Sequence, residues 1–251
     1  MGLVKLMKDL TGKVALITGA SRGIGAAVAQ LLAEWGADIV INYRSKSSRA
    51  EEVATNITAI GGRAILAQAD ITNESDMSDM FATVVAECGK LDLLILNASG
   101  GMEKDKSTNY AMDLNLTAQS RLVDRALPLM NDGGRIVFIT SHLAHFYDRK
   151  PVYEMYELVA ASKYAGEQAL RKRIPQLLER GISLVVVSGD LIEGTITPKL
   201  MERAQPGFIN ERREQAGSLP TVADFASAIA DACNNSSLGS GETIFVGNTE
   251  W

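Results

Sequence analysis

Seven short apolar runs, separated from one another by helix-like segments or loops, constrain the fold of this chain more than any other feature. Short apolar runs bounded by turn residues are typical of strands that are buried on both faces. Strands that alternate with helical crossovers predict a parallel sheet covered by helices on both sides. We expect strands at 14–18, 38–42, 64–68, 91–96, 135–140, 182–187 and 242–246. We expect helices at 24–35, 48–60, 73–88, 110–130, 156–180 and 221–232.

The chain is predicted to form one domain over residues 1–251, with the doubly wound Rossmann fold. Its 251 residues suit a single α/β domain, and 46% hydrophobic and 22% charged residues exclude a disordered or fibrous chain. The segment 194–219 is polar, carries Pro198 and Pro206, and interrupts the alternation. Sheets of this kind bind ligands at the carboxyl ends of their strands. The segment is therefore either a surface excursion or a substrate lid.

Charge and cysteine content exclude several classes of partner. The net charge of −5 gives no support to nucleic-acid binding. No apolar run approaches the ~18 residues of a membrane span, and no signal peptide is visible. Cys88 and Cys233 can build neither a disulfide framework nor a metal site, and a reduced cytoplasmic location is expected.

A glycine-rich loop follows the first predicted strand and opens the first predicted helix. Glycines let the backbone turn sharply and approach a pyrophosphate, while the helix N-terminus offers free N–H groups. The Gly-x3-Gly-x-Gly spacing differs from the common dinucleotide motif, and the lysine of an ATP-binding loop is absent. We predict a dinucleotide site that includes Gly19, Ser21, Arg22, Gly23, Ile24 and Gly25.

The residues after the second predicted strand indicate which nicotinamide cofactor is bound. An acidic residue there would bind the ribose 2′-hydroxyl of NAD. This chain instead has Arg44, Ser45 and Lys46, with Arg22 in the glycine loop. Guanidinium groups suit a 2′-phosphate, so we predict NADP at Arg44 and Ser45, with NAD the less favoured cofactor. The alternative is that Arg44 and Lys46 only solvate a loop.

From Gly12 to about Gly247 the chain resembles the short-chain dehydrogenases/reductases. The resemblance rests on the glycine loop and on Asp70-Ile71, Asn97-Ala98-Ser99-Gly100, Asn115, Ser141, Lys163 and the segment 188–195. It implies an oxidoreductase that acts on a small molecule and assembles as a homodimer or homotetramer. It further implies that the cofactor contacts Asp70, Ile71, Asn97, Ala98, Ser99, Lys163 and Gly189. The usual family motif Asn-Asn-Ala-Gly is replaced here by Asn-Ala-Ser-Gly.

The resemblance also assigns catalytic roles. Hydride transfer to a carbonyl or a conjugated alkene builds negative charge on the substrate oxygen, so a proton donor must lie beside it. A tyrosine is the family's donor, and a neighbouring lysine lowers its pKa from about 10. Lys163 is thus expected to tune that tyrosine and to hold the nicotinamide ribose. Ser141 would bind the substrate oxygen, and Asn115 would hold a water in the proton relay.

The catalytic tyrosine does not stand at the usual position. The family spacing Tyr-x3-Lys places both side chains one helical turn apart, but Val159 occupies that position. Tyr156 precedes Lys163 by seven residues, which on a helix returns to nearly the same face about 10.5 Å away. This spacing resembles the enoyl-acyl-carrier-protein reductase branch. We predict Tyr156 as the acid, with Tyr153 or Tyr147 as alternatives.

Three functional hypotheses remain open. The first is an NAD(P)H-dependent oxidoreductase that acts on a 3-oxoacyl or enoyl thioester or a small ketone: the tyrosine spacing favours enoyl reduction, and Ser141 favours ketone reduction. The second, motivated by Val159, is an NADP-binding regulatory or scaffold protein with a degraded catalytic set. The third is a relative of sugar-nucleotide epimerases, suggested by residues 162–167, but the chain leaves little room for a nucleotide-sugar domain.

Overall fold

The computed structural model of the chain describes residues 8–103, 106–107 and 109–251, and its centre is a parallel sheet. The strands lie in the order β3-β2-β1-β4-β5-β6-β7, and every neighbouring pair is parallel. The strands are β1 (Val14–Ile17), β2 (Asp38–Tyr43), β3 (Ala64–Gln68), β4 (Leu91–Leu96), β5 (Met130–Ser141), β6 (Ser183–Gly189) and β7 (Thr243–Val246). This order confirms the predicted doubly wound fold.

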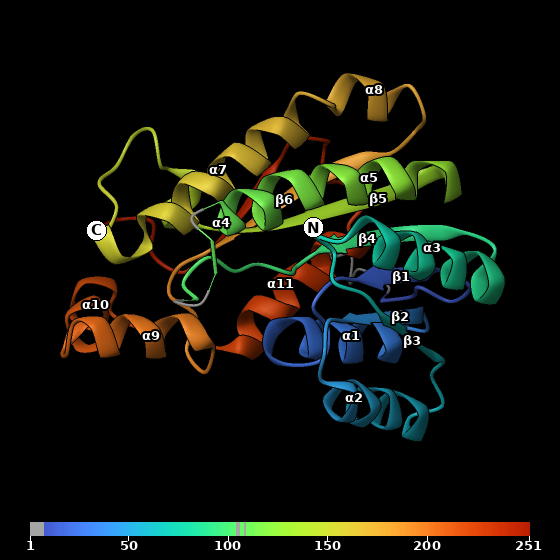
Figure 1. Cartoon of the computed structure of the whole chain (residues 1–251), viewed down its shortest axis with the longest axis horizontal. Helices are drawn as coiled ribbons and strands as arrows, with labels where there is room; N and C mark the ends of the chain where they lie inside the picture. Colours follow the sequence, from blue (N-terminus) through green and yellow to red (C-terminus); the bar gives the residue numbers. More distant parts are fainter. Residues whose placement is uncertain (1–7, 104–105, 108) are drawn as a thin grey trace, which may run out of the picture.

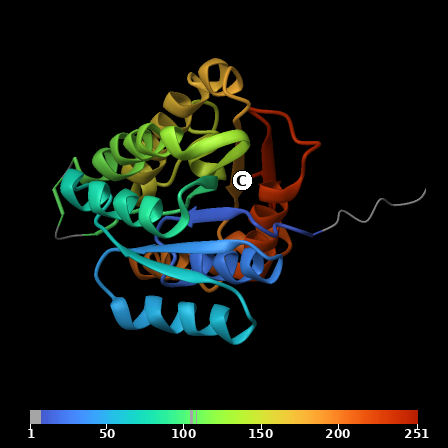
Figure 2. The same cartoon turned by 90° about the vertical axis from the view of Figure 1, so that its right-hand side faces the viewer.

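Helices cover both faces of the sheet (Figures 1 and 2). One face carries α1 (Gly23–Glu34), α2 (Ser47–Ala59) and α11 (Val222–Asn234), and the other carries α3 (Glu74–Cys88), α5 (Gln119–Ala126) and α7 (Glu157–Arg171). The remaining helices are α4 (Tyr110–Met112), η1 (Asp113–Ala118), η2 (Leu127–Leu129), α6 (His142–His145), η3 (Glu154–Tyr156), α8 (Ile174–Leu178), α9 (Ile196–Ala204) and α10 (Phe208–Ala216).

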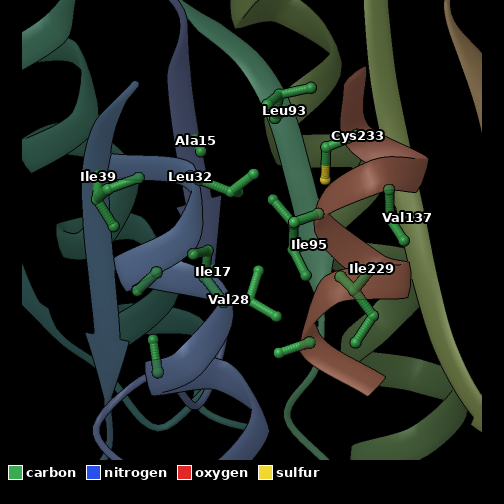
Figure 3. Packing of buried hydrophobic residues seen from close by; sticks show 14 of the residues in the cluster. Ala15, Ile17, Val28, Leu32, Ile39, Leu93, Ile95, Val137, Ile229 and Cys233 are labelled. Atoms are coloured by element: carbon green, nitrogen blue, oxygen red, sulfur yellow. The ribbon is translucent and has the colours of Figure 1, made fainter. Parts of the chain in front are cut away.

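The first strand shows why the apolar runs are uninterrupted. Ala15 and Ile17 pack toward α1 and α11, whereas Val14 and Leu16 pack toward α3 and α5. Figure 3 shows Ala15 near Leu32 of α1 and Ile17 near Val28 of the same helix, with Ile229 of α11 on the same side of the sheet. Because successive side chains of a strand point to opposite faces, a strand covered on both sides has to be apolar at every position.

The strand order reverses between β1 and β4, and this reversal positions the functional cleft. The chain first builds outward through β2 and β3 and then returns to place β4 on the other side of β1. The connections that leave β1 and β4 therefore diverge, and they open a crevice at the carboxyl ends of these strands.

Several helix boundaries differ from the prediction. Gly89, at φ 69°, ends α3, and Thr221 caps α11 with a reciprocal capping box. The helix expected at 48–60 begins one residue earlier, at Ser47, and its cap residue Lys46 makes no side-chain bond. No helix in the described part of the chain has the length and apolar character needed to cross a bilayer.

The two long predicted helices are both subdivided. The first runs from α4 through a π-helical segment η1 to α5 and η2, and Pro128 lies in η2 where the helix ends. The second breaks after Arg171, and α8 restarts with Pro175 in its first turn, because proline lacks the N–H that would continue α7. The segment 194–219, for which no helix was predicted, contains α9 and α10.

Candidate active site

A cavity of about 900 Å³ runs along the carboxyl ends of the strands. It extends from the β1–α1 loop to α9 and α10, and segments from both halves of the sheet line it. Every residue predicted to bind the cofactor lines this cavity. These residues are Gly19, Ser21, Arg22, Gly23, Ile24, Gly25, Arg44, Ser45, Asp70, Ile71, Asn97, Ala98, Ser99, Lys163 and Gly189.

The glycine loop is held closely against the end of β4. Gly19 has φ 65°, and a Cβ at Gly25 would lie 2.6 Å from Asn97 Nδ2. Asn97 Nδ2 donates to the carbonyls of Thr18 at 2.8 Å and Gly19 at 3.2 Å. The backbone N–H groups of Asn97 and Ala98 both donate to Thr18 Oγ1 at 3.0 Å. Asn97 therefore also shapes the loop, a role that the sequence reasoning missed.

The N-terminus of α1 has the features of an anion site. Its cap residue Arg22 makes no side-chain capping bond, and no acidic residue lies in its first turn. The first N–H groups and the positive end of the helix dipole are thus available to a negatively charged group. Together with a loop whose close approach leaves no room for a Cβ at Gly25, these residues fit the pyrophosphate of a dinucleotide.

Basic side chains line the end of the cavity beyond β2. They are Arg22, Arg44, Lys46 and Arg49, and none of them has an ion-pair partner among residues 8–103, 106–107 and 109–251. Arg44 Nη1 donates to Tyr110 Oη at 2.7 Å, which connects the end of β2 to α4 across the cavity. Sequence reasoning missed Arg49 and Tyr110. The charge of Arg49, three positions after Lys46, was the available signal.

Ser141 and Tyr156 meet at the other end of the cavity. Ser141 ends β5, and its Oγ lies 3.3 Å from Tyr156 Oη. Burial raises the pKa of Tyr156, while the bond to Ser141 acts in the opposite direction. The phenol therefore stays protonated near neutral pH and can donate a proton. The helix predicted to start at Tyr156 starts at Glu157, so Tyr156 ends the short turn η3 instead.

The two alternative tyrosines are placed differently. Tyr147 donates its hydroxyl hydrogen bond to Glu157 and does not line the cavity. Tyr153 lines the cavity, but its ring packs edge-on against Phe208 with centroids 4.8 Å apart. Tyr156 is thus the tyrosine that lies beside Ser141 among the described residues.

Lys163 lines the same cavity and is 8% exposed. Burial lowers the pKa of its ammonium to about 8, and the nearby Glu167 carboxylate acts in the opposite direction. Lys163 is therefore mostly protonated at neutral pH but is poised to lose its proton in mild alkali. A charge of this kind could stabilise a developing phenolate or bind a ribose hydroxyl.

Asn115 is the one predicted catalytic residue that does not line the cavity. It lies in the π-helical segment η1, and its Nδ2 donates to Gly100 O at 2.8 Å and to Ser162 Oγ at 2.9 Å. Its Oδ1 is buried without a hydrogen-bond partner in the described chain. Asn115 thus connects α7 to the loop after β4, and its predicted part in a proton relay stays a prediction.

The wall beyond Ser141 and Tyr156 is largely apolar; the sequence pointed to Tyr153 and to the segment 194–219 near the site, but not to Met102 or Leu143. One buried ion pair interrupts it: Arg212 of α10 donates to Asp190 at 2.9 and 2.8 Å, and both side chains are at most 6% exposed. No group of metal-ligating side chains occurs in the part of the chain that the structure describes. The apolar wall contains Met102, Leu143, Tyr153, Val159, Leu191, Ile196, Met201 and Phe208.

Relatives identified by sequence are oxidoreductases. The chain is 37% identical over 144 residues to "Hydroxynaphthalene reductase-like protein Arp2" of Metarhizium brunneum, which covers 55% of this chain and 54% of that one. It is 32% identical over 192 residues to "1-cyclohexenylcarbonyl-CoA reductase" of Streptomyces collinus, which covers 72% of this chain and 65% of that one. The chain spans about half the length of the curated relatives it matches first.

Solved structures match over almost the whole chain. A short chain dehydrogenase from Burkholderia cenocepacia in complex with NADP has a TM-score of 0.82 at 30% identity, over 94% of this chain and 97% of that one. A 7α-hydroxysteroid dehydrogenase complexed with NADH and a 7-oxo bile acid conjugate has a TM-score of 0.85 at 29% identity, over 99% of both chains. Residues 13–205 match the short chain dehydrogenase family, and the chain therefore belongs to this family.

Proposed function

We propose that this protein is an NADP(H)-dependent oxidoreductase that transfers a hydride between the nicotinamide and a carbonyl or enoyl substrate. One observation carries the proposal. The Ser141–Tyr156 pair and Lys163 line one end of a cavity whose other end is the glycine loop. A single bound dinucleotide could therefore reach from the loop to the reacting groups.

The side chains divide the chemistry between them. The nicotinamide supplies the hydride when it is bound. Ser141 Oγ is available to hydrogen-bond the substrate oxygen, and Tyr156 donates its proton to that oxygen as negative charge develops there. Lys163 stabilises the resulting phenolate through its charge and holds the nicotinamide ribose. Asn115 holds a water that returns the proton to this chain of groups.

The proposed cofactor is NADP rather than NAD. Arg22 and Arg44 support this choice, because they line the cavity and carry no acidic partner in the described chain. A guanidinium without an acidic partner matches the charge and geometry of a 2′-phosphate. One structural neighbour holds NADP and another NADH. The affinities of this protein for the two cofactors therefore have to be compared directly.

The substrate class is proposed as an uncharged ketone or an enoyl thioester. The apolar wall supports an apolar substrate body, and Arg212 on this wall is already paired with Asp190. Of the relatives, one is named as a CoA thioester reductase and the other as a hydroxynaphthalene reductase-like protein. Ser141 favours ketone reduction, and the Tyr156–Lys163 spacing favours enoyl reduction.

The test is NADPH oxidation with acetoacetyl and crotonyl thioesters and with simple and cyclic ketones. We expect turnover with at least one acceptor, with NADPH bound at least tenfold more tightly than NADH. Tight NADPH binding without turnover on the whole panel would instead support the regulatory or scaffold alternative. Absence of binding to either nucleotide would overturn both.

We further propose that the chain forms one cofactor-binding domain in which residues 194–219 serve as the substrate lid. Ile196, Met201 and Phe208 support this role because they line the cavity. Trypsin cleavage at Arg203, which is exposed in the last turn of α9, is the test. Cofactor and substrate together should slow the cleavage severalfold, and a rate that ligands do not change would contradict a lid.

A homodimer or homotetramer and a cytoplasmic location complete the proposal. Met112 of α4 and Leu158 of α7 support self-association, since they are 40% and 60% exposed on neighbouring helices. Both cysteines are free, which fits a reducing compartment. Light scattering coupled to size-exclusion chromatography tests the oligomer, and a monomer would contradict it.

A further inference from the structure

A buried carboxylate lies one helical turn beyond the proposed catalytic lysine. Glu167 follows Lys163 by four residues on α7 and is 1% exposed. Its Oε1 lies 2.8 Å from His145 Nδ1 and accepts a hydrogen bond from Arg171 Nε, also at 2.8 Å. Residues four apart on a helix share one face, so Lys163, Glu167 and Arg171 form a continuous row of charges.

Three elements fix this carboxylate in place. His145 belongs to α6, the short helix that directly follows the β5 strand ending at Ser141. Arg171 is anchored in turn, since its guanidinium donates to Gly241 O at 2.7 Å and to Thr243 Oγ1 of β7 at 2.6 Å. The position of the Glu167 carboxylate is therefore set by α6, α7 and β7 together.

One oxygen of Glu167 and the ammonium of Lys163 have no partner in this row. Glu167 Oε2 is buried without a hydrogen bond, and Lys163 makes no ion pair or hydrogen bond with any residue that the structure describes. Burying an unpaired charge is costly, so the Glu167 carboxylate, one turn along the same helix face, lowers the cost of burying the Lys163 ammonium.

We propose that Glu167 is a positioning residue whose buried carboxylate keeps Lys163 protonated, with His145 and Arg171 holding that carboxylate in place. The proposal rests on the proposed role of Lys163 in the reaction. Without the Glu167 carboxylate, the buried Lys163 ammonium would lose its proton close to neutral pH. A neutral lysine could neither stabilise a tyrosinate nor offer a charged donor to a ribose.

The charges around the pair are few. Near Glu167, the titratable or charged groups are His145 on α6 and Lys163, Tyr164 and Arg171 on α7, while β7 contributes the neutral Thr243. Burial lowers the pKa of Lys163 to about 8, and Glu167 is the charge that opposes this change. Loss of the Glu167 charge therefore moves the deprotonation of Lys163 to lower pH.

The direct test follows the Lys163 ammonium in the cofactor-free protein. Protein labelled with ¹³C and ¹⁵N in lysine is titrated by NMR, and the Lys163 signal is assigned by its loss in Lys163→Met. Wild-type Lys163 should titrate near pH 8, and in Glu167→Gln it should titrate about one pH unit lower. An unchanged titration would overturn the proposal, whatever reaction the protein catalyses.

Two further variants separate charge from structure. Glu167→Asp keeps a carboxylate and should restore most of the wild-type titration. Glu157→Gln is the matched control, because it makes the same chemical change on the same helix, where Glu157 accepts from Tyr147 instead. It should leave the Lys163 titration in place, and an equal shift in this control would also overturn the proposal.

A second measurement needs no variant. Should Glu167→Gln fail to fold, the ¹³C carboxyl signal of Glu167 in the wild-type protein should move at the pH where Lys163 titrates. A signal that is flat through that pH would overturn the pairing.

The pH dependence of NADPH oxidation links the pair to the reaction. In Glu167→Gln its alkaline limb should move by the same number of pH units as the Lys163 titration. The rate of NADPH oxidation at pH 6 should change less than the rate on the alkaline limb. A lysine titration that shifts while the alkaline limb stays in place overturns the proposed role of Lys163 and leaves the charge pairing intact. The two proposals can thus fail separately.

Discussion

The two ends of the cavity are built in different ways. At the cofactor end, the glycine loop is held by backbone groups and by Asn97, which directly follows β4, all near the switch between β1 and β4. At the substrate end, side chains from distant segments meet. Arg212 of α10 bonds Asp190 after β6 and the carbonyls of Asn248 and Glu250.

This difference explains how members of one family can keep the same cofactor site while their substrate sites vary. The cofactor end depends on the backbone conformation of one strand–loop–helix unit and on the Asn97 hydrogen bonds that hold it, so few of its side chains can change without loss of the site. The substrate end depends on side-chain contacts, such as the Arg212–Asp190 pair and the hydrogen bond that Trp251 Nε1 donates to Pro151 O, and such side chains can be exchanged while the sheet remains intact. Four variants test whether the two ends are this independent.

The largest effect is expected at the substrate end, from Tyr156→Phe. The change removes the hydroxyl beside Ser141 and little else, so kcat should fall by about 10²–10⁴-fold while the NADPH dissociation constant stays within twofold. Steady-state kinetics and NADPH fluorescence measure the two quantities. Tyr153→Phe is the matched control on the same wall and should keep most of the activity. The assignment fails if the two variants exchange these results.

A large effect at the cofactor end should come from Gly25→Ala. The added Cβ would lie 2.6 Å from Asn97 Nδ2 and 2.7 Å from Gly19 O, so the loop has to open and NADPH affinity should fall by about 100-fold. Gly61→Ala, at φ 83° in open space, is the control: it should cost about 1 kcal/mol of stability and leave the affinity unchanged. Normal NADPH binding by Gly25→Ala would show that the loop is less constrained than its contacts imply.

A residue at the substrate end should also make the stability of the protein sensitive to acid. Burial lowers the pKa of His142, which contacts Ser188 Oγ at 2.8 Å, to about 4. Between pH 6.5 and about 4 the unfolded chain binds a proton that the folded chain excludes, so stability falls as the pH drops. From pH 7 to pH 5 this amounts to about 2 kcal/mol. Denaturant unfolding of His142→Asn should show a correspondingly smaller loss, and equal acid sensitivity would contradict the assignment.

The smallest effect concerns cofactor choice and should leave the substrate end untouched. Arg44→Gln should weaken NADPH binding by about tenfold and leave NADH binding unchanged, because only NADPH carries the 2′-phosphate. Arg63→Gln is the control, since Arg63 pairs with Asp38 and Glu87 outside the cavity. Equal losses for both nucleotides would assign Arg44 to structure, through its bond to Tyr110, rather than to selectivity.

The sequence predicted the fold and the cofactor end because their determinants are local. A buried parallel strand appears in the sequence as an apolar run, and the residues of the glycine loop are contiguous. The sequence alone therefore assigns Gly19 and Gly25 to the cofactor site. Arg49 and Tyr110 were not predicted. Arg49 lies in a helix, and Tyr110 reaches the site only because α4 packs across the cavity.

The substrate end could not be predicted to the same degree. Its Arg212–Asp190 pair joins residues from separate elements of the chain, and no periodic pattern in the sequence predicts such a contact. The position of Tyr156 was inferred from helical periodicity, yet Tyr156 precedes the first residue of α7. Its distance from Lys163 is thus set by the η3 turn, which the sequence did not reveal.

The contact between Gly166 and the π-helical segment η1 has an evolutionary consequence. A Cβ at Gly166 would lie only 2.1 Å from Asn115 O, so α7 and η1 can approach this closely only while position 166 lacks a side chain. Any single mutation there pushes apart the helices that carry Lys163 and Asn115. Descendants of this chain can therefore exchange the residues of the substrate wall one at a time, but they inherit position 166 without a viable one-step alternative.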